Sequence, residues 1–497
     1  MTTDGSTVGP THAERPLALA VDIGSSSIRA GLYDRCGRLV KGSAAKVPYG
    51  WDLGPEGSVR LHPGVLLERV EHALDETAAA AGPLARDAVV AGVSCFFHSL
   101  VGLDDAGRPL TPVLSWADTT SAGEAAALRA TVDARRAHAC TGAPLHAGYW
   151  PARVLRLRRE QPAIRRWAGF PELLTGALTG RAVVSRSMAS GTGLMDRACG
   201  AWWPEILDRL SVDGGQLSPL VDDDQPIGRL EAAAARRWPA FAHLDWFAAW
   251  GDGACGNVGL GATGPGQAAL MIGTSGAIRT IIREPAPRIV PGLFVYRLGE
   301  GAVVGGQLSE GGGTAASISG LLRRSSASLE RAAAGLVPDG HGLTILPYVH
   351  GERGLGYHDG ARGVLAGLAS QSDAPSIYRA FLEAIAYRFA ALDERLATLL
   401  PAPPSITASG GALARSPLWA QIVADSLGRD IALAPAVEAS CRGAALLALR
   451  GARLFDELDA APRPRARTIR FDPGRAARYR AARARQEQLY TDLLGRA

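Results

Sequence analysis

The stretch VDIGSSSIRAGLYD, residues 21–34, places an acid, a glycine and three consecutive hydroxyls between two apolar runs. This pattern predicts a strand, a tight turn and a returning strand. Gly and Ser are ordinary turn residues, so Asp22 could simply satisfy local amides. The same turn could instead bind phosphate, because glycine lets a ligand approach the backbone closely and turn N–H groups with hydroxyls form a concavity for its oxygens.

A second copy of this pattern occurs about half a chain later, in AALMIGTSGAIRTIIR at residues 268–283. The sequence IGSS at residues 23–26 aligns with IGTS at residues 272–275, which is the relation expected of two similar halves. Two such turns that face each other across a cleft could grip a triphosphate from both sides. Asp22 would then stand where it can hold a hydrated magnesium ion.

Length and composition describe a folded protein with more than one domain. The 497 residues exceed what a single hydrophobic core supports, and two large domains fit this length. Hydrophobic residues make up 47% of the chain and charged residues 20%, which excludes the disordered and fibrous classes.

The cysteines and the absence of long apolar segments indicate the compartment. The six cysteines show neither CxxC nor Cys/His ligand spacing, which argues against a disulfide framework or a zinc site and favours a reducing cytoplasm. Residues 1–15 lack the pattern of a signal peptide and are interpreted as a flexible tail. No stretch reaches the roughly 18 uncharged apolar residues of a membrane helix, so no membrane partner is expected.

The basic residues argue against two other kinds of partner site. The chain has a net charge of +5, but its basic residues are dispersed among acids rather than gathered in one stripe. Nucleic-acid binding is therefore not expected. Lysine occurs only at Lys41 and Lys46, and neither follows the GxxxxG spacing that a P-loop needs. A nucleotide site in this chain therefore cannot be a Walker-type cradle.

The pattern of predicted elements favours two α/β domains. Short β-like runs such as DAVVAGVSC alternate with helical stretches such as PGVLLERVEHALDETAAAA, which is typical of an α/β layered domain. We place the boundary just before GDGACGNVG, so that residues 16–247 form one domain and residues 248–497 form the second. The final RAARYRAARARQEQLYTDLL predicts a terminal helix that packs back on the body.

A third glycine turn lies in ITASGGALARSPLWAQIVADSLG, residues 406–428. The segment predicts a strand, a Gly410-Gly411 turn and a helix with Ser416 as N-cap and Pro417 at its first position, ending at Gly428. In structural terms this is only a good connection between a strand and a helix. In functional terms, a flat Gly-Gly-Ala backbone could lie against an adenosine.

Together these segments resemble the FGGY family of carbohydrate kinases, within the superfamily of sugar kinases, Hsp70 and actin, and most resemble the gluconate kinases of that family. The resemblance covers nearly all of residues 17–450. It rests on seven segments that occur in the family's order: VDIGSSSIRAGLYD, FFHSLVGLDDAGRPLTPVLSWAD, GDGACGNVGLGA, IGTSGAIR, LPYVHGER, SGGALARSPLWAQIVAD and EASCRGAALLA.

The resemblance implies a two-domain, ribonuclease-H-like fold in which duplicated domains enclose a cleft. ATP and Mg²⁺ would lie on the side of the second domain and a sugar on the side of the first, in an enzyme that acts alone or as a homodimer. The aspartate of the GDG motif, Asp252, would be the catalytic base, and Asp22 and Asp252 would hold the metal. The ATP-binding residues implied are Gly24, Ser25, Ser26, Ser27, Gly273, Thr274, Ser275, Gly312, Gly313, Gly410, Gly411 and Ala412.

Four further residues are implied on the sugar side. His98 and Asp118 would bond sugar hydroxyls, and Trp116 would offer a flat apolar wall to the sugar C–H faces. By itself, His98 could equally be a satisfied core histidine. Arg153 stands where the gluconate kinases usually have a lysine and could pair with the carboxylate of gluconate, or it could be a solvated helix residue.

The chain departs from the family pattern at three positions that bear on the substrate. Thr120 replaces the arginine of WxDxR, Ser185 replaces the aspartate of VVDxSxAS, and Leu355 replaces the proline that commonly follows GER. The hypothesis is an ATP-dependent kinase that converts D-gluconate to 6-phosphogluconate. The alternatives are a xylulose, other pentulose or polyol kinase, and a catalytically weak nucleotide-binding regulatory relative.

Overall fold

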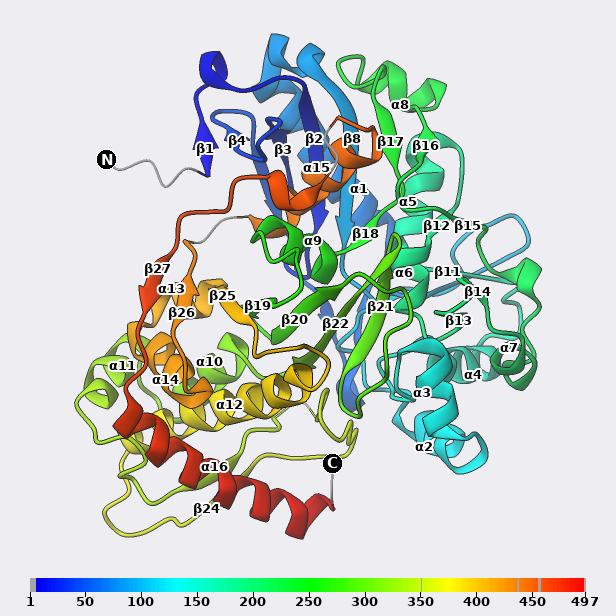
Figure 1. The fold of residues 1–497 in the computed structure, drawn as a ribbon. Helices are drawn as coiled ribbons and strands as arrows, with labels where there is room; N and C mark the ends of the chain where they lie inside the picture. Colours follow the sequence, from blue (N-terminus) through cyan, green and yellow to red (C-terminus); the bar gives the residue numbers. More distant parts are fainter. Residues whose placement is uncertain (1–5, 350, 436–437, 455–456, 496–497) are drawn as a thin grey trace.

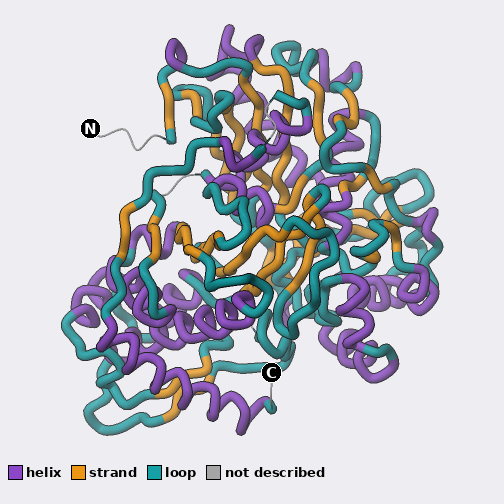
Figure 2. Tube along the Cα trace, viewed as in Figure 1, coloured by secondary structure: helices purple, strands orange, loops and turns teal. Residues whose placement is uncertain are grey.

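The computed structural model describes residues 6–349, 351–435, 438–454 and 457–495 (Figure 1). Its strands form two large mixed sheets, each built around one of the two predicted hairpins. Figure 2 shows the strands running through the interior and most helices lying at the periphery. Among the described residues, no helix has the length and apolar character needed to cross a bilayer. All six cysteines are free thiols.

The first sheet has the order β1-β4-β3-β2-β8-β17-β16, with β5 paired to β3 and β18 paired to β8. Strand β2 runs antiparallel to β3 and parallel to β8, and every residue of β2 is buried. A central strand covered on both faces requires a continuous apolar run, which explains LALAV before Asp22. The strands are β1 (Thr7–Val8), β2 (Leu17–Ile23), β3 (Ser27–Tyr33), β4 (Leu39–Val40), β5 (Ala45–Pro48), β8 (Ala88–Cys95), β16 (Pro226–Gly228), β17 (Asp245–Phe247) and β18 (Trp250–Gly251).

The second sheet has the order β21-β22-β20-β19-β25-β26-β27. Strand β19 runs antiparallel to β20 and parallel to β25, which repeats the relation of β2 to β3 and β8. The predicted duplicated α/β architecture is therefore confirmed. The strands are β19 (Gln267–Ile272), β20 (Gly276–Ile282), β21 (Phe294–Leu298), β22 (Gly301–Leu308), β25 (Ser405–Ser409), β26 (Ile431–Leu433) and β27 (Arg467–Ile469).

The remaining elements surround these sheets. In the first half they are β6 (Asp52–Leu53), β7 (Val59–Leu61), α1 (Pro63–Ala81), β9 (Val101–Leu103), β10 (Val113–Leu114), α2 (Ala122–Thr131), α3 (Ala134–Thr141), α4 (Trp150–Glu160), β11 (Arg166–Ala168), α5 (Phe170–Thr179), β12 (Val184–Ser185), α6 (Arg186–Ser190), β13 (Met195–Asp196), β14 (Ala201–Trp202), α7 (Pro204–Leu210), β15 (Leu220–Val221) and α8 (Ala232–Arg237). In the second half they are α9 (Asp252–Gly259), α10 (Gly312–Leu321), α11 (Ser326–Ala334), β23 (Thr344–Leu346), β24 (Val364–Ala366), α12 (Ala374–Ala397), α13 (Gly411–Arg415), α14 (Pro417–Leu427), α15 (Ala439–Gly451) and α16 (Pro473–Leu494).

Residues 7–15 of the predicted flexible N-terminal tail are joined to the first sheet. Residues 1–5 lie outside the described residues. Thr7–Val8 forms the edge strand β1, which pairs in parallel with β4. Arg15 bonds Asp87 at 3.0 Å. Residues 7–15 are therefore tied to the first sheet by backbone and side-chain pairing, which a reading of composition could not reveal.

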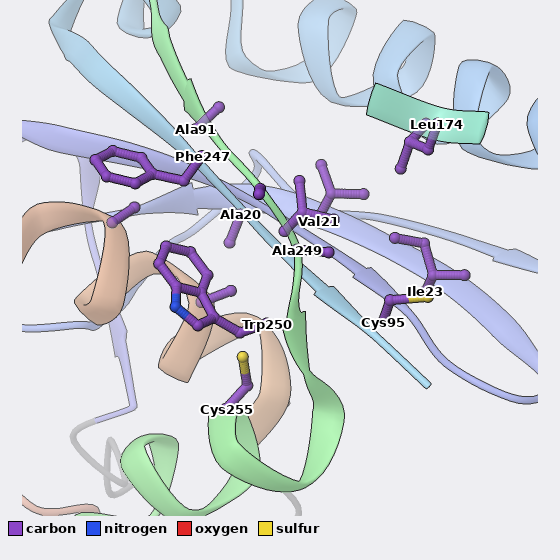
Figure 3. Close-up of a cluster of buried hydrophobic side chains, with 14 of the residues drawn as sticks. Ala20, Val21, Ile23, Ala91, Cys95, Leu174, Phe247, Ala249, Trp250 and Cys255 are labelled. Carbon is purple, nitrogen blue, oxygen red and sulfur yellow. The ribbon is translucent and has the colours of Figure 1, made fainter. Parts of the chain in front are cut away.

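Helices α9 and α15 lie on the first sheet although both follow residue 247 in the chain. Figure 1 shows α15 against β2 and β8. The backbones of the two helices are in direct contact at Gly443. A Cβ added there would lie 1.8 Å from the carbonyl oxygen of Cys255. Figure 3 shows Trp250 and Cys255, on either side of Asp252, packed with Ala20 and Val21 of the sheet. This packing fixes the start of α9.

We expect Gly443→Ala to lower the free energy of unfolding by about 1–3 kcal/mol, since neither backbone can give way to the new methyl group. Urea unfolding would measure this loss. Gly320→Ala in α10 is the matched control, because nothing lies within 4 Å of a Cβ there and a helical Gly→Ala change is stabilising by about 0.5–1 kcal/mol. Equal changes in the free energy of unfolding for the Gly443→Ala and Gly320→Ala variants would contradict the close contact at Gly443.

Candidate functional site

A cavity of about 320 Å³ lies between the two halves of the molecule. Both predicted turns line it, with Gly24, Ser25 and Ser26 from the first and Gly273, Thr274 and Ser275 from the second. Asp22, His98, Trp116 and Asp252 line the same cavity. The structure thus brings together ten of the predicted site residues from segments far apart in the chain.

The first turn presents free amides to this cavity. Trp51 Nε1 donates to the carbonyl of Ser25 at 2.7 Å, and the amide of Tyr49 donates to that of Ser26 at 3.1 Å. Within the described residues, no backbone carbonyl accepts from the amides of Ser25 and Ser26. Carbonyls held away from the cavity and unpaired amides beside it make an anion-binding concavity. Ser27, also predicted from this turn, does not line the cavity, because it is buried as the first residue of β3.

The second turn is held by the glycines at the start of α10. The amide of Gly312 donates to the carbonyl of Gly273 at 2.7 Å, and that of Gly313 donates to Thr274 at 3.0 Å. Both glycines were predicted to bind ATP, but neither lines the cavity, and their amides already serve the turn. A side chain at Gly312 would also meet the Cβ of Ala412 at 3.0 Å, so the third turn lies beside the second. Residues 410–412 do not line the cavity either.

Two acids face the cavity from the first sheet and from α9. The strand register places Asp22 opposite Arg29 and Ser94, and its carboxylate accepts from Ser94 Oγ at 2.8 Å and from Arg29 Nη1 at 3.0 Å. Burial, aided by repulsion from Asp252, raises the pKa of Asp22 to about 6. Burial also raises the pKa of Asp252, while Arg279 and the amide of Gly253 oppose that shift.

The pair of acids fits a divalent cation. Asp22 and Asp252 are close enough to repel one another, and a hard cation bound between carboxylate oxygens would relieve that repulsion. Asp252 is also the first residue of α9, where the helix dipole favours a negative charge. Asp22 already bonds Arg29, so an ion there would share or replace that partner.

Three arginines that line the cavity were not assigned a role from the sequence; Arg29 pairs with Asp22, and Arg279 and Arg353 have no such partner. Arg279 on β20 makes only a 3.7 Å contact with Met271 Sδ, and Arg353 lies with its guanidinium 4.6 Å from the centre of the Trp116 ring. Neither forms an ion pair with a described acid. Arg279 lies in the segment AIRTIIR and Arg353 in the segment GER, but only the fold shows that these two side chains face a cavity.

His98 is placed to accept a hydrogen bond from a ligand. Its Nδ1 lies 2.7 Å from the carbonyl oxygen of Gly191, so Nδ1 carries the proton and Nε2 is an acceptor. Burial holds the pKa of His98 well below its usual range, and the nearby Arg353 acts in the same direction. The ring is therefore neutral at ordinary pH.

Asp118 and Arg153 do not line the cavity, in contrast to the prediction. Asp118 is buried and accepts from the amide of Val59 at 2.9 Å. Arg153 is 0% exposed and donates to four backbone carbonyls, those of His98, Ser115, Asp118 and Ala147. Four of the five N–H groups of its guanidinium hold these loops together, and the side chain does not line the cavity. It is not the solvated helix residue of the alternative reading either.

Comparison with known proteins decides the family. Residues 17–259 match the N-terminal domain of the FGGY family of carbohydrate kinases, and residues 269–452 match its C-terminal domain. The chain belongs to the FGGY family. It is therefore a carbohydrate kinase, a phosphotransferase with an alcohol group as acceptor, in a family that uses ATP and has an actin-like two-domain fold.

Similar proteins act on different substrates. The gluconokinase of Bacillus subtilis (strain 168) is 26% identical over 473 residues, which cover 92% of this chain and 91% of that protein. The xylulose kinase of Streptomyces coelicolor is 29% identical over 445 residues, which cover 87% of each. A solved gluconate kinase from Lactobacillus acidophilus has the same fold, with a TM-score of 0.87 at 23% identity over 96% of this chain and 98% of that chain.

The three departures from the FGGY pattern have structural partners here. Thr120, in place of an arginine, bonds Asp118 and accepts from Arg156 of α4, so an arginine still reaches this site from another element. Ser185 caps α6, its Oγ accepting from the amide of Met188 at 3.1 Å. Leu355 has φ +39°, a conformation that the family's proline cannot adopt.

The buried carboxyl of Asp22 gives a prediction about stability and pH. Because its pKa is raised to about 6, the folded protein holds this proton more tightly than the unfolded chain, and the carboxyl destabilises the fold as pH rises from about 4 to about 6. We expect Asp22→Asn to gain stability relative to the native chain across that range, reaching about 1–3 kcal/mol at pH 7.

Urea unfolding of both proteins at several pH values between 4 and 7 would measure this difference. Asp104→Asn is a control of opposite sign, because bonds from Arg108 hold the pKa of half-buried Asp104 below its usual value. A difference between the Asp22→Asn variant and the native chain that stays constant with pH would contradict the raised pKa.

Proposed function

We propose that this carbohydrate kinase transfers the γ-phosphoryl group of ATP to a hydroxyl of D-gluconate and forms 6-phosphogluconate. The main support is the single cavity in which both glycine turns and Asp252 meet. The likeness to two gluconokinases, at 26% and 27% identity, supports the acceptor. A xylulose or other pentulose is the second candidate, because xylulose kinases match at 24–29%.

Asp252 would act as the general base of the reaction. Its carboxylate accepts the proton of the acceptor hydroxyl as the hydroxyl oxygen attacks the γ-phosphorus, and the bond from that phosphorus to the β–γ bridging oxygen breaks to release ADP. Burial raises the pKa of Asp252, which makes it a stronger base, and the nearby Arg279 opposes that rise. Asp22 and Asp252 would hold Mg²⁺, which neutralises phosphate charge when bound.

The phosphates of ATP would lie between the two turns. The free amides of Ser25 and Ser26 on one side and the hydroxyl of Thr274 on the other are the groups nearest to such a ligand, and Arg279 supplies a cation for the transferred phosphoryl group. Residues 410–412, beside the second turn, would contact the adenosine. The sugar would lie on the side of His98 and Trp116.

We also propose that the protein resides in the cytoplasm and forms a homodimer. The absence of any disulfide among the six cysteines suits the cytoplasm. A homodimer would appear as twice the 51.8 kDa chain mass in light scattering.

A coupled assay of ADP release tests the proposal with D-gluconate, D-xylulose, D-ribulose, glycerol and erythritol. Highest kcat/KM on D-gluconate supports it, and highest kcat/KM on D-xylulose supports the second candidate. Nucleotide binding without turnover on any acceptor would instead favour a regulatory relative.

Replacing Asp252 should separate chemistry from binding. We expect Asp252→Asn to lower kcat by on the order of 10² or more, the usual contribution of a positioned base, with ATP affinity close to native. Asp245→Asn, at an acid outside the cavity, is the control and should keep native kcat. A native kcat in the Asp252→Asn variant would remove this residue from the mechanism.

The third turn can be tested at Gly411. A Cβ there meets only the flexible end of Arg415, at 3.0 Å, so Gly411→Val should fold. We expect its KM for ATP to rise while its KM for the acceptor stays native, because the side chain intrudes only on the adenosine. Gly410 is unsuitable, since its φ is +110° and a Cβ would lie 2.3 Å from the carbonyl oxygen of Ile272. An unchanged KM for ATP would refute the assignment.

A further inference from the structure

We propose that Arg353 binds the carboxylate of the acceptor and makes the enzyme selective for linear sugar acids over neutral sugars. This inference rests on the proposed function, since it takes the acceptor to occupy the cavity. It replaces the predicted role of Arg153 with a residue from the other half of the chain.

Arg353 differs from the other arginines buried among the described residues. It is 7% exposed, it lines the cavity, and no described residue accepts a hydrogen bond from it or pairs with it as an acid. Its Nε is buried without a partner. By contrast, each of the other buried arginines donates to carbonyls or to a carboxylate; these are Arg153, Arg197, Arg379, Arg388 and Arg442.

A buried cation without a partner is costly, so a structure that keeps one usually supplies a ligand for it. The flank of the guanidinium is taken by the Trp116 ring, at 4.6 Å. A planar donor fork that keeps its edge free matches a carboxylate, which can accept two parallel hydrogen bonds from it.

The loop around Arg353 is built to hold this orientation. The neighbouring Glu352 accepts from Tyr490 of α16 at 2.8 Å, from Tyr348 at 3.2 Å and from the amide of Gly356 at 3.3 Å. Leu355 and Tyr357 have positive φ values of 39° and 55°. Strained backbone persists only where its surroundings enforce it, and it gathers at ligand sites.

The far end of the same loop is joined to the first half of the molecule. Asp359 accepts from Arg129 at 2.9 Å and lies 3.0 Å from His146 Nε2. The loop is therefore anchored on both sides, by α16 and by the sugar-side segments. Such anchoring pre-organises Arg353 before the acceptor arrives.

Arg353 lies within electrostatic reach of Asp252, Glu310 and Arg153, but none of these forms an ion pair with it. His98 is neutral, and Tyr296 and Gln307 complete this part of the cavity lining. The acids of the lining are Asp22 and Asp252, which belong to the phosphate-transfer centre. An acceptor with a carboxylate at one end and a hydroxyl at the other can therefore place its charge on Arg353 and its hydroxyl at Asp252.

The experiment compares D-gluconate with D-glucitol, which has a neutral CH₂OH group in place of the carboxylate. We expect native enzyme to prefer D-gluconate in kcat/KM by about 10²-fold, in line with a charge-assisted pair, and Arg353→Gln to lose most of that preference. The KM for ATP should stay within about twofold of native. Arg362→Gln, at an exposed position of the same loop, should keep native selectivity.

The outcomes separate the two proposals. Retained selectivity in the Arg353→Gln variant, or equal losses on both acceptors, would overturn the role of Arg353 while leaving the gluconate assignment in place. A raised KM for ATP would show instead that Arg353 serves phosphate. Native enzyme that phosphorylates D-xylulose but no aldonate would overturn both the proposed function and this inference. Arg353→Lys, which keeps the charge without the fork, should recover part of the selectivity.

Discussion

The contact between helices α9 and α15 is the constraint on which the rest of the site depends. At Gly443 and Gly259 the two backbones approach so closely that neither position has room for a side chain. This approach lets α15, a helix from the second half of the chain, cover the first sheet and brings the first residue of α9, Asp252, to the edge of that sheet. Because α9 is followed by β19 of the second sheet, the same contact aligns the two glycine turns across one cavity.

Charge is distributed unevenly along this cavity. The two acids Asp22 and Asp252 lie at one part of it, where the charge of Asp252 helps to raise the pKa of buried Asp22. Arg29 and Arg279 moderate that repulsion, and Arg353 stands apart beside an aromatic ring. A site of this kind is matched to anionic ligands at more than one point. It gains most from them when water is excluded, because electrostatic attraction strengthens as the dielectric constant falls.

The part of the site that could be predicted from the sequence is the part made by short segments. A strand that ends in Asp, Gly and hydroxyls encodes its own turn, so Asp22 and both turns were recognisable without the fold. Arg279 and Arg353 were not, because nothing local tells an arginine that faces a cavity from one on the surface. Asp118 and Arg153 misled for the same reason: their motifs placed them near the sugar side, but their side chains are used by neighbouring backbone groups.

The sequence by itself determined the duplicated α/β architecture, the family and the chemical type of the turns, since these follow from residue order, apolar periodicity and glycine placement. Only the tertiary structure decided which charged groups share a cavity. That outcome depends on loops that are far apart in the chain, such as the one from Gly351 to Asp359, which is held by a helix more than 100 residues later. Burial and partnering of a side chain are properties of this packing, so they determine whether an arginine supports the fold or is free to bind a ligand.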